Sequence, residues 1–92
     1  RKISEYQTEI ETLKSDYELN NQKIAALEDK NHQLEDGKKY QTAEEIEETN
    51  REIQSNKNQL EALKTEQENN LTDQAEYEQR ISKTQEQADD LI

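Results

Sequence analysis

The sequence predicts an all-α fold, a long parallel two-stranded left-handed coiled coil, and three observations lead to this prediction. The 92-residue chain is 27% hydrophobic and 38% charged, which is too polar for an ordinary globular core. It has no proline and one glycine, so little in it interrupts a helix. Its apolar residues recur at the heptad spacing by which two helices pair along a narrow seam.

The first heptad series begins at Ile3 and covers residues 1–34, with eight of its ten core positions apolar. Its predicted dimer-interface residues are Ile3, Tyr6, Ile10, Leu13, Tyr17, Ile24, Leu27, Asn31 and Leu34. Asn31 at an a position is expected to fix two strands and one register, because its symmetry mate satisfies the buried amide. This periodicity argues against disorder, which the low hydrophobicity and the net charge of −11 would otherwise indicate.

A second heptad series, offset by one residue, covers residues 46–92. Its predicted interface residues are Ile46, Ile53, Leu60, Leu63, Tyr77, Ile81, Ala88 and Leu91. Across both series six of the seven Ile occupy a and five of the eight Leu occupy d, which favours two parallel strands. Opposite charges at g and the following e, such as Lys23 with Glu28 and Glu52 with Lys57, agree with that pairing.

Residues 35–45 join the two series and form a predicted soft zone of a single segment, residues 1–92. A one-residue register shift near Gly37 has to be absorbed by local unwinding of the supercoil. Glycine in a helix costs about 1 kcal/mol against Ala, which adds to the softness. In a second weak stretch, residues 64–76, three successive core positions carry amides: Gln67, Asn70 and Gln74.

The Asp36-Gly37 pair raises an alternative, an antiparallel helical hairpin that turns at these two residues. Asp-Gly is a strong turn signal. Its arms, residues 1–36 and 38–92, would be unequal and would leave a long apolar stripe unpaired. The g and e charge pairs would also lose their meaning, so the parallel homodimer is the preferred prediction.

No residue pattern suggests catalysis, and we expect no enzymatic activity, cofactor, metal or small-molecule substrate. Four carboxylates crowd residues 44–48, but a two-stranded rod has no pocket in which to bury them. His32 is the only histidine and cysteine is absent, so a zinc or haem site is not expected. With 23 Asp and Glu against 12 Lys and Arg, nucleic acid and anionic membranes are disfavoured partners, and membrane insertion is not expected.

A second copy of the chain is the main expected partner. Tyr40 in the soft zone and Leu71 in the weak stretch lie outside the seam. They are the predicted contacts for another protein at residues 35–45 or 64–76. We read the chain as a piece of a longer protein. The sequence leaves its compartment open, with the cytoplasm or cytoskeleton preferred and a bacterial cell surface as the alternative.

The core pattern from Ile3 to Leu34 and from Ile46 to Leu91, with one extra residue between, resembles the rods of myosin tails, kinesin stalks and vesicle-tethering golgins. This resemblance covers the whole chain. It implies a structural rod that dimerises chains and spaces or tethers the domains at its ends. The run Lys2-Ile3-Ser4-Glu5 and the polar core residues are similar to streptococcal M-type surface rods. That likeness implies an alternative function, a scaffold that binds partner or host proteins.

Overall fold

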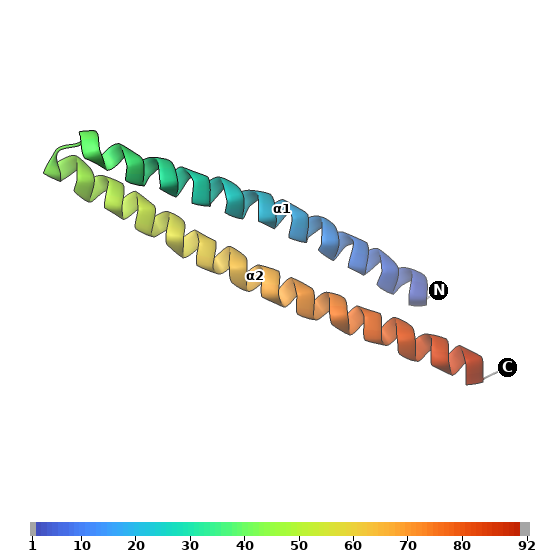
Figure 1. The fold of residues 1–92 in the computed structure, drawn as a ribbon. Helices are drawn as coiled ribbons and strands as arrows, with labels where there is room; N and C mark the ends of the chain where they lie inside the picture. The colour runs from blue at the N-terminus through green and yellow to red at the C-terminus, as the bar shows by residue number, and fades with distance from the viewer. Residues whose placement is uncertain (1, 91–92) are drawn as a thin grey trace. The chain divides into compact units, whose positions relative to one another are not determined.

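The chain folds into two long helices joined by a short turn (Figure 1). The computed structural model describes the backbone of residues 2–90 and the side chains of residues 2–87. Helix α1 spans Lys2–Gly37, the 3-10 helix η1 spans Lys38–Tyr40, and helix α2 spans Ala43–Asp90. No strand occurs between residues 2 and 90, so the predicted all-α class is confirmed.

The chain divides into two compact units, each built from one stretch of α1 and one of α2. Unit 1 comprises Arg1–Leu19 and Gln67–Ile92, and unit 2 comprises Asn20–Glu66. Within each unit the two stretches run antiparallel, because the partner's residue number on α2 falls as the number on α1 rises. The contacts are Tyr6 with Tyr77, Leu13 with Asn70 and Tyr17 with Gln67 in unit 1, and Asn20 with Glu66 and Asn31 with Asn56 in unit 2.

The shielded side chains recur along both helices at heptad spacing. On α1, all ten core positions of the first predicted series, from Ile3 to Leu34, are buried or half-buried. On α2, the twelve core positions of the second series from Ile46 to Thr84 are also buried or half-buried, and every other side chain in these two stretches is exposed. The apolar periodicity therefore selects the face that each helix turns toward its neighbour.

The turn lies in unit 2, at residues 38–42. Gly37 keeps a right-handed helical backbone (φ −71°, ψ −20°), so the chain does not reverse at Asp36-Gly37. It leaves the helical conformation at Gln41, whose backbone is extended (φ −108°, ψ 155°) and whose N–H donates to the Lys38 carbonyl at 3.1 Å. Unit 2 is consequently a helical hairpin.

A capping box starts α2. Thr42 Oγ1 accepts the backbone N–H of Glu45 at 3.3 Å, and Glu45 Oε1 accepts the backbone N–H of Thr42 at 3.1 Å. The Thr42 carbonyl accepts the first helical hydrogen bond, from Ile46, at 2.9 Å. These bonds satisfy amide groups that a helix start leaves without partners, and so they fix where α2 begins.

The expectation of one helix continuing through residues 35–45 is corrected by this turn. The predicted soft zone contains the end of α1, the 3-10 helix and the start of α2. Each helix carries its own heptad series, so the one-residue offset between the series coincides with the turn and requires no unwinding. The helices as described have 36 and 48 residues, and the turn takes up residues 38–42, which the predicted hairpin placed in its second arm.

Candidate functional site

In unit 1 the predicted interface residues lie against the other helix of the same chain. Ile10 is buried at 8% exposure. The half-buried members of the set are Ile3, Tyr6, Leu13, Tyr17, Tyr77 and Ile81. The Tyr6 and Tyr77 rings form a tilted pair with centroids 5.9 Å apart, a geometry that aromatic rings prefer. Ala88 and Leu91 lie outside the residues whose side chains are described.

The three amides at core positions of residues 64–76 form hydrogen bonds along the seam of unit 1. Gln67 Nε2 donates to the Tyr17 carbonyl at 2.9 Å, and Asn70 Nδ2 donates to the Leu13 carbonyl at 2.8 Å. Gln74 Nε2 donates to Asn70 Oδ1 at 2.6 Å. A hydrogen bond is directional whereas hydrophobic contact is not, so these amides set the level at which α2 lies along α1 in this unit.

In unit 2 the seam is more apolar and contains an asparagine pair. Ile53 and Leu60 are 4% and 8% exposed. The other predicted apolar interface residues are half-buried: Ile24, Leu27, Leu34, Ile46 and Leu63. Asn31 was expected to pair with its own symmetry mate, but within this chain Asn56 Nδ2 donates to Asn31 Oδ1 at 2.8 Å. Because Asn56 is buried, this amide pair is expected to disfavour any slip of one helix along the other.

One ion pair joins the two helices of unit 2. Lys30 Nζ lies 3.5 Å from Glu52 Oε1, and both residues occupy g positions. Antiparallel helices bring g positions together, whereas parallel helices set g against the e of the next heptad. Both side chains are about half exposed, so the pair contributes a few tenths of a kcal/mol and selects orientation more than it stabilises.

The predicted partner contacts lie on the surface of their units. Tyr40 is 84% exposed at the turn, with Lys39 Nζ 5.3 Å from its ring centroid. Leu71 is 51% exposed and borders a surface hollow of unit 1 with Lys14 and Tyr17. Leu19 is equally exposed and was missed, although its place outside the seam was a readable signal.

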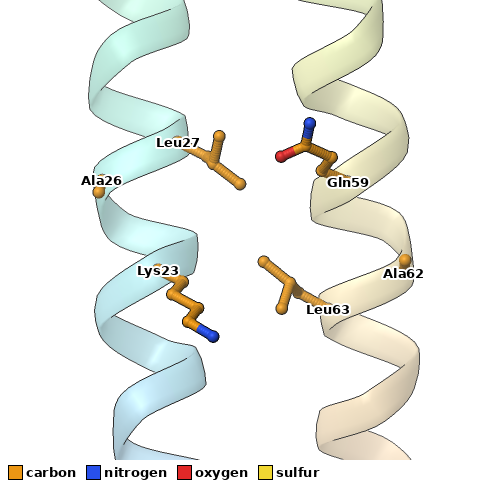
Figure 2. A pocket seen from close by; sticks show the side chains of 6 residues that line it. All are labelled: Lys23, Ala26, Leu27, Gln59, Ala62 and Leu63. Atoms are coloured by element: carbon orange, nitrogen blue, oxygen red, sulfur yellow. The ribbon is translucent and has the colours of Figure 1, made fainter.

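An open groove of about 510 Å³ lies on one side of unit 2, and its lining residues form what we call the groove face. They are Lys23, Ala26 and Leu27 on α1, and Gln59, Ala62 and Leu63 on α2. Figure 2 shows Leu27 and Leu63 pointing into the space between the helices, with the two alanines farther from the middle. The groove was not predicted, although an Ala-Leu pair occupies matching heptad positions on both helices.

The carboxylates of residues 44–48 lie on the exposed surface of α2 in unit 2. Hydrogen bonds from the Thr42 backbone N–H and side chain lower the pKa of Glu45. Among the described residues, no three His, Cys, Asp or Glu side chains are placed to hold a metal ion. In the same part of the chain, neither helix contains a stretch apolar and long enough to cross a membrane.

Comparisons of the chain with protein-family models, curated proteins and solved structures found no match. What the chain does therefore has to be inferred from its helix contacts, its charges and the groove face of unit 2.

Proposed function

We propose that the chain is a non-enzymatic structural coiled-coil module that holds protein segments together through helix–helix contacts. In this role it tethers or spaces the parts attached to its ends. The observation that carries the proposal is that shielding on both helices follows the heptad series, while the flanking side chains are exposed and mostly polar. Such a surface serves pairing, since a thin seam leaves little room to enclose a substrate.

Two pairings are compatible with the same seam. In a parallel homodimer, each helix would meet its copy in another molecule, as the Ile and Leu distribution favours. In the intramolecular pairing, α1 meets α2 of the same chain. We favour the second pairing because the polar groups of the seam find partners that way: Asn31 with Asn56, Lys30 with Glu52, and Asn70 with the Leu13 carbonyl.

Cysteine cross-linking tests which pairing forms in solution. The chain has no cysteine, so any disulfide comes from the introduced thiols. The Asn31→Cys, Asn56→Cys double variant should form a disulfide within one chain, because the side chains it replaces are in hydrogen-bond contact. Oxidation at low protein concentration followed by non-reducing electrophoresis should then give a fast-moving monomer.

Matched variants separate the two outcomes. Asp29→Cys with Asn58→Cys is the control, because both residues occupy outward f positions at nearly the same level, and it should not close within the chain. In a parallel homodimer, Asn31→Cys alone would instead give a covalent dimer. Loss of helicity in circular dichroism, with no specific cross-link in any variant, would contradict the proposed module as a whole.

A second candidate function, a scaffold that binds a partner or host protein, is favoured by Tyr40. Its ring is the most exposed of the large hydrophobic side chains described, and it lies beside Lys39 at the turn. Aromatic residues are enriched in the cores of protein–protein interfaces. Tyr40→Ser should weaken binding to such a protein at least tenfold, whereas Leu19→Ser should not. Equal effects of both variants would argue against Tyr40 as the contact.

A further inference from the structure

We propose that the groove face of unit 2 binds the same face of a second copy, so that two helical hairpins stack into an antiparallel four-helix bundle. This inference rests on the intramolecular pairing favoured above. It goes beyond that pairing by naming the surface and the partner through which whole molecules associate.

The first argument is incomplete burial. Leu27 and Leu63 point into the groove but remain half-buried, whereas Ile53 and Leu60 in the same unit are below one tenth exposed. A helix pair has two open sides, and a second layer of helices is the usual way to cover an apolar side. Covering both leucines would remove the most apolar part of the groove from water.

The second argument is access. Ala26 and Ala62 are exposed, and each presents only a methyl group beside a leucine of the groove. Helices pack with axes about 8–10 Å apart, and small residues at the contact allow the closer distances. The small alanines at its rim therefore leave the groove, about 510 Å³ in volume, open to the side chains of a facing helix pair.

The third argument selects a second copy as the occupant. On this side of unit 2, the g positions of α1 carry Lys23 and Lys30, and those of α2 carry Glu52, the neutral Gln59 and Glu66. Lys30 and Glu52 also pair within the chain, so in the dimer they would form a shared network of four charges. A twofold axis parallel to the helices lays α1 of one copy against α2 of the other. The basic row of each copy then faces the acidic row of its mate, which is the self-complementarity that a twofold interface requires.

The net charge of −11 overstates the electrostatic repulsion between two groove faces. Unit 2 has eleven Asp and Glu against seven Lys and Arg, a net charge of −4, and the remaining −7 belongs to unit 1. The groove face itself contains one lysine and no carboxylate. Self-repulsion is therefore weakest in the unit that carries the groove.

The test uses the chain locked as a hairpin by the Asn31→Cys, Asn56→Cys disulfide, so that a parallel coiled coil cannot account for a dimer. Sedimentation equilibrium at micromolar concentrations should return twice the chain mass of 10.9 kDa. Ala26→Glu should raise the dimer Kd roughly tenfold or more, because it buries a charge in the contact. Ala25→Glu, the same change at the neighbouring exposed b position, should leave the Kd unchanged.

Two variants of opposite charge test directly whether a second copy of the chain occupies the groove. One locked chain carries Lys23→Glu and Lys30→Glu, and the other carries Glu52→Lys and Glu66→Lys. Each alone should be monomeric, and their mixture should form heterodimers. The inference is overturned if the disulfide-locked chain without further substitutions stays monomeric. It is also overturned if Ala25→Glu and Ala26→Glu change the dimer Kd equally. Failure of the disulfide to close within the chain contradicts the intramolecular pairing instead.

Discussion

Unit 1 and unit 2 pair their helices at the same heptad positions, but different interactions hold the two helices together in each unit. Unit 1 has a single buried apolar residue among those described, Ile10, and joins its helices by amides that donate to backbone carbonyls and by a tyrosine pair. Unit 2 buries Ile53 and Leu60 and adds a side-chain amide pair. Apolar burial is strong but non-directional, and hydrogen bonds are weaker but directional. The difference indicates that apolar burial is greater in unit 2, whereas unit 1 depends more on directional hydrogen bonds.

The largest change in stability is expected from a substitution in the apolar seam of unit 2. Ile53→Ala should lower the free energy of unfolding by about 2–4 kcal/mol, because it removes buried methyl groups and leaves a cavity. Ile10→Ala should cost less, since Ile10 is 8% exposed against 4% for Ile53. Urea unfolding followed by circular dichroism measures both. Equal losses would refute the concentration of apolar stability in unit 2.

Replacing the seam amides of unit 1 should give the next largest change in stability, and this change should be an increase. Gln67→Leu with Asn70→Leu should raise the free energy of unfolding by roughly 1–2 kcal/mol. The carbonyls of Tyr17 and Leu13 lie within α1 and keep their helical hydrogen bonds, and the amide of Gln74, which loses Asn70 Oδ1 as its acceptor, is only half-buried. Spin-label distances between positions 6 and 77 should broaden at the same time. A loss of stability would mean that the amide bonds outweigh the apolar gain.

A smaller effect is expected at the end of α1 in unit 2. Gly37 has helical backbone angles, and a Cβ added there would have no heavy atom within 4 Å. Gly37→Ala should therefore raise the free energy of unfolding by about 0.5–1 kcal/mol. Ala25→Gly, within α1, calibrates the measurement and should lower stability by a similar amount. Thermal unfolding is sufficient to detect both shifts.

The smallest effect is a pH dependence at the start of α2. The hydrogen bonds from Thr42 lower the pKa of Glu45, so its contribution is present above the ordinary pKa of a glutamate and is lost as pH falls through the lowered value. Glu45→Gln keeps a side-chain acceptor without the charge. The wild-type chain should exceed this variant in stability near neutral pH and lose that advantage in acid. Glu47→Gln, at an exposed position, is the control, and an identical pH profile for it would exclude the capping box as the cause.

The sequence predicted the helical class, and among residues 2–87, whose side chains are described, those it placed on the two seams are buried or half-buried. It did not determine which molecule supplies the second helix, because parallel and antiparallel pairs bury the same a and d positions. Asn31 illustrates this limit, since a buried amide requires a partner but does not specify Asn56 or a symmetry mate.

The turn was misplaced for a different reason. Asp36-Gly37 was read as the turn signal, yet Gly37 remains helical. The sequence Thr42-Ala43-Glu44-Glu45 is a capping box, and it was the more informative signal because it states where a helix starts. The groove face was missed because alanines outside a seam look like ordinary helix surface until a neighbouring helix is in place.

The Tyr6–Tyr77 contact has a mechanical consequence. A force that separates these two rings acts perpendicular to the helix axes of unit 1. It therefore breaks the contacts between the helices one after another, including the hydrogen bonds of Gln67 and Asn70. A parallel homodimer pulled along its length would instead load all levels together in shear. A chain paired within itself and pulled by both ends should therefore yield gradually at low tension, whereas the parallel homodimer should yield abruptly at a higher one.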